Sequence, residues 1–339
     1  MWSNAPAYSL TWEWTLKKLR DRSLLGLLAA ILLTTGCSAG TQSADTPAAD
    51  VVLKVGDQKG GAKSVLTAAG LLDDFPYKIE WSTFTSGPPL LEAASAGAID
   101  VGAVGNTPPI FAAAANAKIA AVGVSKGQVE ADAILVPENS PLRSVAELRG
   151  KNIAVAKGSS AHGQILLTLR SAGLTTKDVT LNFLQPADAY GAFTQGRVDA
   201  WAVWDPYTAQ AQQEAKARVL TTGEGRSNGY GFQVAGKKAL EDKGKNPALK
   251  EYLIRYYKAQ KWADTHREEW AKAWAAETGL KYDVALAAVN RNGDAVVKLD
   301  DTVIRSEQEL ADAFTEDKTL PGKVDFAKFV DTRFQGDLA

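Results

Sequence analysis

The stretch "GAIDVGAVGN", Gly97 to Asn106, returns later in the chain as "GRVDAWAVWD", Gly196 to Asp205. Each copy joins a glycine and an aspartate to an alternating apolar run, a pattern that predicts a strand. The offset of 99 residues also carries Phe84 onto Phe183, so the similarity begins upstream of the strand. A strand repeated together with its surroundings predicts two halves of like topology.

The composition excludes several classes of protein. The chain has 339 residues, of which 45% are hydrophobic and 23% charged, so it is long enough for two domains with cores and is not wholly disordered. The formal net charge is −1 and no dense stripe of lysine and arginine occurs. Non-specific nucleic-acid binding needs a basic face, so we expect no nucleic-acid partner.

The amino terminus has the features of an export signal. Four basic residues between Lys17 and Arg22 precede the apolar run "LLGLLAAILL", residues 24–33. This run is too short to span a bilayer and has the length of a signal-peptide core. We therefore expect residues 1–36 to be a signal peptide and the protein to be exported, facing the periplasm or the cell exterior.

The only cysteine of the chain, Cys37, ends the sequence "TTGC" directly after this run. The segment resembles the lipobox of bacterial lipoproteins, although Thr34 stands where that motif usually has a leucine-like residue. The resemblance implies that Cys37 is lipidated and anchors the protein to a membrane, with residues 38–50 as a flexible tether. An uncleaved anchor, a misassigned start codon and a buried structural cysteine are the alternatives.

From Val51 onward, short apolar runs alternate with longer amphipathic ones, which predicts an α/β fold with largely parallel sheets. The rhythm begins again after residue 151, and helices follow at about 247–278 and 282–290. We expect a discontinuous lobe 1, residues 51–136 and 233–339, around a lobe 2 of residues 137–232. Two hinge crossings would then fall near Val136 and Phe232.

Three strand-to-helix turns, "TSGPP", "GNTPP" and "KGSSAH", share one design. Each places a hydroxyl, an amide or a glycine at the first residues of a helix, where backbone N–H groups and the helix dipole favour anions. The residues concerned are Ser86 and Gly87, Asn106 and Thr107, and Ser159 and Ser160. Any one turn is adequately explained as a helix cap, but three in matching positions predict an anion site at the carboxyl ends of the strands.

Two further segments could contribute to such a site. "GDQKGG" follows the first strand and offers the Gln58 amide, but it lacks the ending of a P-loop, and no dinucleotide motif occurs. In "WAVWDP", Trp201 and Trp204 must face opposite sides of a strand. We place Trp204, beside Asp205, in the wall of a cleft; the alternative is that both tryptophans are packing residues.

The histidines and the second tryptophan pair have weaker signals. His162 could donate a hydrogen bond to an anion from the first turn of its helix, and a capping or packing role is the alternative. Trp270 and Trp274, four residues apart, share one helical face and are expected in a core. No metal-spaced His/Cys cluster and no nucleophile with a neighbouring histidine occur, so we expect no catalysis, cofactor or metal.

The block "FTSGPPLLEAASAGAIDVGAVGNTPPIFAAA", residues 84–114, resembles the substrate-binding proteins of ABC transporters for aliphatic sulfonates, in a group that includes taurine- and nitrate-binding relatives. The resemblance implies a two-lobe periplasmic-binding-protein fold of type II that closes on a sulfonate and delivers it to permease and ATPase subunits. A monomer is expected. The same resemblance implies a ligand site made of Gln58, Ser86, Gly87, Asn106, Thr107, Ser159, Ser160, His162 and Trp204, supported by Asp205. Taurine, nitrate, bicarbonate or a thiamine precursor as ligand, and an enzyme on the same fold, stay open as alternatives.

Overall fold

Two β-sheets organise the part of the chain that the computed structural model describes, which is residues 47–293, 295–320 and 322–338. These residues belong to one compact unit, Asp45–Ala339. The expected signal peptide, Cys37 and the tether as far as residue 46 lie outside the described residues. Among the described helices, none is both long enough and apolar enough to cross a membrane.

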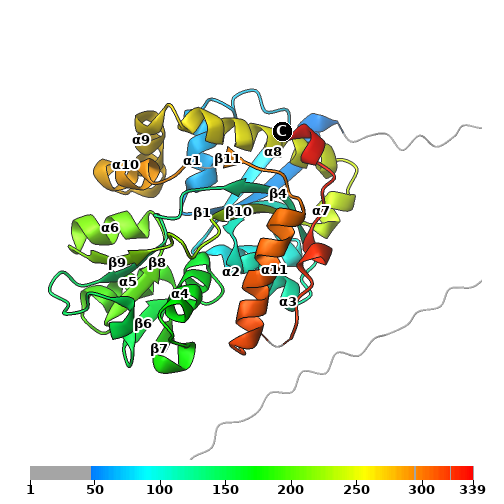
Figure 1. The fold of residues 1–339 in the computed structure, drawn as a ribbon. Coiled ribbons are helices and arrows are strands. Elements are labelled where there is room, and N and C mark those ends of the chain that lie inside the picture. Colours follow the sequence, from blue (N-terminus) through cyan, green and yellow to red (C-terminus); the bar gives the residue numbers. More distant parts are fainter. Residues whose placement is uncertain (1–46, 294, 321, 339) are drawn as a thin grey trace, which may run out of the picture. The chain divides into compact units, whose positions relative to one another are not determined.

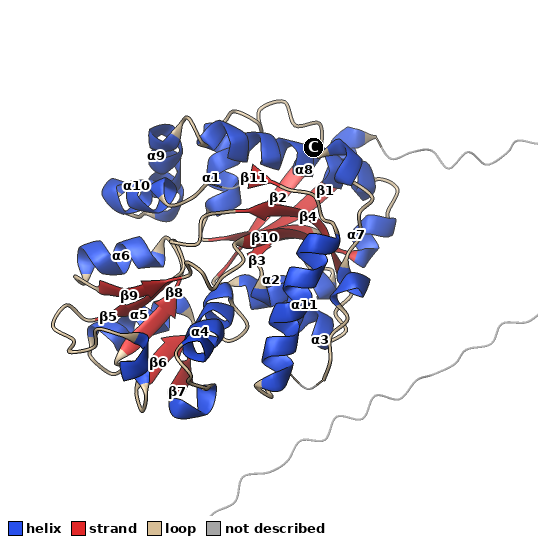
Figure 2. Cartoon of the chain, in the orientation of Figure 1, coloured by secondary structure: helices blue, strands red, loops and turns tan. Residues whose placement is uncertain are grey.

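The first sheet has six strands in the order β11-β4-β10-β3-β1-β2 (Figure 1 and Figure 2). Strands β1, β2 and β3 are parallel, whereas β10 runs antiparallel between β3 and β4. Its strands are β1 (Val52–Gln58), β2 (Lys78–Phe84), β3 (Val101–Gly105), β4 (Ile119–Lys126), β10 (Tyr230–Gly236) and β11 (Ala295–Val296). The strand β10 therefore joins this sheet from a distant part of the sequence.

The second sheet repeats this plan with five strands in the order β7-β6-β8-β5-β9. Strands β6, β7 and β8 are parallel, and β5 runs antiparallel between β8 and β9. Its strands are β5 (Ala133–Val136), β6 (Asn152–Val155), β7 (Thr180–Phe183), β8 (Ala200–Val203) and β9 (Arg218–Thr222). The repeated sequence segments, β3 and β8, occupy matching places in the two sheets.

The repeat extends to individual hydrogen bonds. The Asp100 carboxylate accepts a bond from the Lys54 backbone N–H of β1 at 2.8 Å. At the equivalent place, the Asp199 carboxylate accepts one from the Asn152 backbone N–H of β6, also at 2.8 Å. The two aspartates thus align the start of a neighbouring strand in each sheet, which explains why the aspartate recurs in both copies of the motif.

Helices cover both faces of each sheet (Figure 2). On the first sheet, α1 and α8 pack on one face, with α9 packed on α1 and α10 on α9, and α2, α3 and α11 lie on the other face. On the second sheet, α4 covers one face and α5 and α6 the other. The bounds are α1 (Gly61–Ala68), α2 (Gly87–Ala96), α3 (Thr107–Ala114), α4 (Ser160–Ser171), α5 (Pro186–Thr194), α6 (Tyr207–Glu214), α7 (Lys237–Glu241), α8 (Lys245–Ala263), α9 (Arg267–Thr278), α10 (Tyr282–Asn290) and α11 (Asp301–Glu316).

Over the described residues the chain changes sheet at two places, residues 127–132 and 223–229. Both lie before the predicted crossings near Val136 and Phe232. Residues 133–136, predicted in lobe 1, form an antiparallel strand of the second sheet. Residues 230–232, predicted in lobe 2, belong to an antiparallel strand of the first sheet. Apolar runs of this kind fit either sheet equally well, so their partners cannot be read from the local sequence.

Close packing at the centre of the first sheet requires glycine at position 102. A Cβ atom there would lie 2.7 Å from Leu90 Cδ2 and 2.9 Å from the Gly56 carbonyl oxygen. We expect Gly102→Ala to lower the free energy of unfolding by about 1–3 kcal/mol in urea denaturation, because the sheet must separate to accept the methyl group. Gly336→Ala, where no atom lies within 4 Å of the new Cβ, is the matched control. Equal stability of the two variants would contradict this packing.

Candidate ligand-binding site

A cavity of about 260 Å³ lies where the two sheets and both crossings meet. Its lining combines residues that follow strands of the first sheet, residues that follow strands of the second sheet, and residues of the crossings. Seven of the ten predicted site residues line it: Gln58, Gly87, Asn106, Ser159, Ser160, Trp204 and Asp205. The other three, Ser86, Thr107 and His162, lie behind this surface and do not line it.

Three helices of the two halves begin at this cavity. A Cβ atom on Gly87 would lie 2.6 Å from Pro108 Cγ, so α2 and α3 start in contact. A Cβ atom on Gly105 would lie 2.9 Å from Ser160 Cβ, which brings the start of α4 to the same point. None of the three N-cap residues makes a side-chain capping bond. The positive ends of three helix dipoles therefore converge without being capped from within.

The prolines and hydroxyls of these turns provide fewer donors for an anion than the sequence predicts. In α2 and α3 the second and third residues are prolines, which lack an N–H, so each helix offers a first amide, Gly87 or Thr107, and little else in its first turn. The hydroxyls mostly donate to protein partners instead of facing the cavity. The Ser86 hydroxyl donates to Gln185 Oε1 at 2.9 Å, and the Ser159 hydroxyl donates to the Ala156 carbonyl at 2.7 Å. Backbone amides, rather than hydroxyls, are the donors left for an anion.

Asn106 is held in place by a buried polar chain. Its Nδ2 donates to Asn228 Oδ1 at 2.8 Å, and its Oδ1 accepts from the Thr107 hydroxyl at 2.9 Å. Asn228, in the second crossing, donates in turn to Glu307 Oε1 at 2.7 Å. Glu307 is fully buried on α11, and burial raises its pKa to about 8. One N–H of Asn106 is therefore fixed on Asn228, and the other remains available to the cavity.

The ring of His162 is buried, with 1% of the residue exposed. It contacts the rings of Phe111, Phe183 and Phe314, and its Nδ1 accepts a bond from the Gly158 backbone N–H at 3.1 Å. Burial lowers the pKa of His162 to about 4, so the imidazole is neutral at neutral pH. This placement matches the packing alternative for His162.

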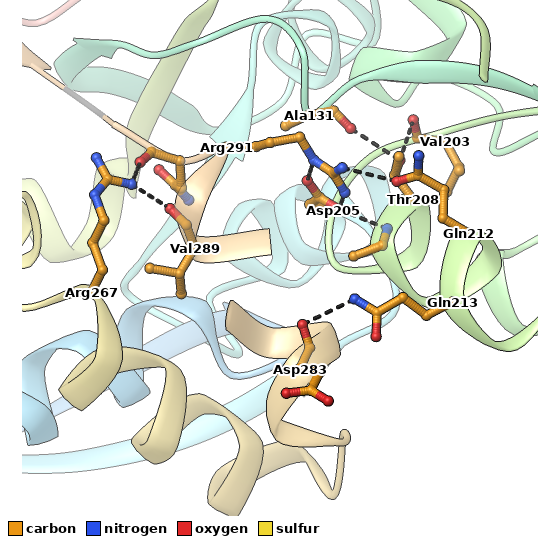
Figure 3. A network of polar contacts seen from close by, with 12 residues as sticks. Ala131, Val203, Asp205, Thr208, Gln212, Gln213, Arg267, Asp283, Val289 and Arg291 are labelled. Carbon is orange, nitrogen blue, oxygen red and sulfur yellow. Dashed lines mark hydrogen bonds and ion pairs between the residues drawn. The ribbon is translucent and has the colours of Figure 1, made fainter. Parts of the chain in front are cut away.

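Asp205 joins the two halves through an ion pair with Arg291 (Figure 3). The guanidinium donates to both carboxylate oxygens at 2.8 Å, and its third nitrogen donates to Gln212 Oε1 at 2.8 Å. Asp205 follows β8 of the second sheet, whereas Arg291 ends α10, which packs on the first. Burial raises the pKa of Asp205, and the bonds from Arg291 oppose that shift. Sequence reasoning missed Arg291 because nothing local marks an arginine at a helix end as a partner.

The remaining lining is aromatic and acidic. Trp204 lines the cavity and Trp201 is buried, and both rings contact Tyr207. Trp270 and Trp274, expected only in a core, stack at 5.6 Å between ring centroids and also line the cavity. Burial raises the pKa of Asp132, in the first crossing, to about 7. Among the described residues, no group of three or more histidine, cysteine, aspartate or glutamate side chains could hold a metal ion.

Comparisons with known proteins agree with this architecture. The model of the NMT1-like family matches residues 65–278. The alkanesulfonate-binding protein SsuA from Xanthomonas axonopodis pv. citri, solved with bound MOPS, is 37% identical with a TM-score of 0.77, over 84% of this chain and 99% of that one. The periplasmic aliphatic sulphonate-binding protein SsuA from Escherichia coli is 36% identical with a TM-score of 0.73, over 83% and 92%.

An enzyme uses the same fold. The desulfurization enzyme DSZB matches with a TM-score of 0.60 over 85% of this chain and 98% of that one, but at 16% identity. That similarity shows the fold alone, whereas the family model covers most of the described residues. The match over residues 65–278 includes the turns that begin α2, α3 and α4, so the chain belongs to the NMT1-like family.

Proposed function

We propose that this protein is the solute-binding protein of an ABC importer and captures an aliphatic sulfonate between its two lobes. The observation that carries the proposal is the convergence of three uncapped helix starts, from both sheets, on one cavity. A sulfonate presents three oxygens to such donors, and two relatives that are 36% and 37% identical are named for binding sulfonates. The relatives named for sulfonates are binding proteins, which supports a role in binding rather than in catalysis.

The two lobes would correspond to the two sheets with the helices that cover them. In this proposal the crossings at 127–132 and 223–229 form the hinge, because there, within the described part of the chain, the backbone passes from one sheet to the other. A ligand can favour the closed form only by contacting both lobes. Gly87 and Asn106 would bind it from the first lobe, and Ser160 and Trp204 from the second.

Among the predicted residues, those that line the cavity form the proposed contact set: Gln58, Gly87, Asn106, Ser159, Ser160, Trp204 and Asp205. Ser86, Thr107 and His162 would act indirectly. Thr107 fixes the Asn106 amide, and Ser86 bonds across to Gln185 of the other half. His162 supports the start of α4 through the Gly158 backbone.

Export and anchoring belong to the same proposal. Residues 1–36 would direct export, and lipidated Cys37 would hold a monomer at the membrane, beside the permease and ATPase subunits that receive the ligand. The basic cluster, the apolar run and "TTGC" support this. Mass spectrometry of the mature amino terminus tests it, since an unmodified Cys37 would contradict the lipid anchor.

A calorimetric screen of residues 38–339 tests the function. We expect alkanesulfonates to bind with micromolar affinity, which corresponds to about 8 kcal/mol, and to bind more tightly as the tail lengthens. Sulfate, nitrate and bicarbonate, which lack a tail, are the comparison ligands. Binding of nitrate or bicarbonate without any response to sulfonates would refute the proposed ligand while leaving the fold and the crossings unaffected.

A further inference from the structure

The cavity continues from the converging helix starts into the interior of the first half. It reaches the face of the first sheet on which α1 and α8 pack. On β1 this face carries Leu53 and Val55 and then Asp57, and on β10 it carries Ala235 and then Gln233. Period-two alternation thus replaces apolar side chains by polar ones where each strand reaches the cavity. We name this part of the cavity the inner chamber.

The inner chamber is bounded by polar groups of the sheet and by aromatic side chains of α8 and α9. All of its residues line the same continuous cavity as the helix starts. They are Asp57, Ser125 and Gln233 on the sheet, and Tyr256, Tyr257, Gln260, Trp270 and Trp274 on the helices. A chamber lined in this way fits the organic end of a ligand whose anion is held elsewhere.

Gln233 is the unexplained group of the inner chamber. Its residue is 2% exposed, and its Oε1 accepts no hydrogen bond from any residue that the structure describes. A buried amide oxygen without a donor destabilises the state that contains it. A ligand that brings a donor to this oxygen would remove that cost.

The indole and amide donors of three neighbouring side chains are engaged elsewhere. Trp270 Nε1 donates to the Ser64 hydroxyl at 3.0 Å, and Trp274 Nε1 donates to the Lys59 carbonyl at 2.7 Å. Gln260 Nε2 donates to the Tyr256 hydroxyl at 2.7 Å. Neither the indoles nor Gln260 therefore satisfies Gln233.

The charges of the lining also favour a donor. The carboxyl and guanidinium groups among the described residues of the cavity lining are Asp57, Asp132, Asp205 and Arg291, and Arg291 is paired with Asp205. The Asp57 carboxylate accepts hydrogen bonds from three backbone N–H groups. An ionised carboxylate has no proton to donate. The inner chamber thus offers acceptors and aromatic faces, which suit a hydroxyl or a protonated amine.

We propose that Gln233 determines specificity by accepting a hydrogen bond from a donor at the far end of the ligand's tail, so that the preferred ligands are sulfonates with a terminal hydroxyl or ammonium group. The proposal rests on the proposed function, since it assigns the sulfonate to the helix starts and the tail to the inner chamber.

Matched ligands test it by calorimetry. On chains of two, three and four carbons, the terminal group is a methyl, a hydroxyl or an ammonium group of similar size, and each compound is titrated into the full chain. We expect a terminal donor to tighten binding by about tenfold or more over the methyl compound at the chain length that reaches Gln233. Tighter binding of the hydroxyl compound alone would show that the site prefers a neutral donor. Still tighter binding of the ammonium compound would show that it prefers a cation beside Asp57.

Three variants assign the gain to one residue. Gln233→Leu should abolish the gain in affinity that a terminal donor gives. Gln233→Glu keeps an acceptor and should retain the gain. Gln335→Leu should leave the gain unchanged. Gln335 is the matched control because its Oε1 is also buried without a partner among the described residues, yet it lies outside this cavity.

The outcomes separate the two proposals. Tighter binding of the methyl compound at every length, or an equal gain in Gln233→Leu, would overturn the specificity role and leave sulfonate binding in place. An absence of binding by every sulfonate would overturn the proposed function and this inference together. Urea denaturation of each variant establishes that a lost gain does not come from a lost fold.

Discussion

Replacing Arg291 by methionine should weaken ligand binding by roughly 10- to 100-fold while leaving the two halves folded. The guanidinium connects Asp205 and Gln212 of the second half to the end of α10, so only a closed arrangement can form these bonds (Figure 3). Without Arg291, Asp205 would stay buried and unpaired, which costs about 3–5 kcal/mol in a fully buried pair. The Arg291 side chain is 26% exposed, so solvent screening reduces this to about 1–3 kcal/mol. Calorimetric titration with the best sulfonate measures the loss.

Arg267→Met is the control for this prediction. Arg267 donates to the Val289 and Asn292 carbonyls of its own half, and among the described residues it makes no hydrogen bond to the second sheet. We expect it to lower stability but to leave affinity within about twofold. Asp205→Asn combined with Arg291→Met should recover part of the affinity, because no buried charge then lacks a partner. Unchanged affinity in folded Arg291→Met would show that closure does not depend on this pair.

The features of the fold that recur locally could be predicted from the sequence. The second copy of the motif around Asp199 predicts two like halves, and the structure shows the two aspartates making the same backbone bond. The strand β10, by contrast, was not predicted. It pairs between β3 and β4, more than a hundred residues away in the chain, and its own sequence does not specify those partners.

The site was predictable to the extent that it depends on turns. Glycine, proline and hydroxyl residues at helix starts signal themselves, and Gly87, Asn106 and Ser160 do line the cavity. Arg291, Asn228 and Gln233 were missed, because each acts through a partner that the fold brings from a distant segment. Glu307 differs from these three residues, because it is a charged residue among the buried, mostly apolar positions of α11, a pattern visible in the local sequence.

Glu307→Gln should stabilise the protein at pH 8 and change little at pH 4. Burial raises the pKa of Glu307 from 4.5 to about 8, so the folded state keeps a proton that the unfolded state releases. Between these values the unfolded state binds fewer protons, and the free energy of unfolding therefore falls as the pH rises, by up to about 3–5 kcal/mol in total. Glutamine cannot ionise, while its amide keeps an oxygen for Asn228 and a donor in place of the acid proton.

The measurement is the difference in unfolding free energy between variant and wild type, from urea denaturation at several pH values. It should be near zero at pH 4, grow between pH 4.5 and 8, and then level off. Tyr230 stays neutral in this range, because burial and the nearby Asp300 and Glu307 carboxyls raise its pKa above the usual value. Glu309→Gln, on the exposed side of the same helix, is the matched control and should give only a small difference. A pH-independent difference for Glu307→Gln would mean that Glu307 is already ionised in the fold, and that its bond to Asn228 holds Asn106 through a charge rather than through a neutral acid.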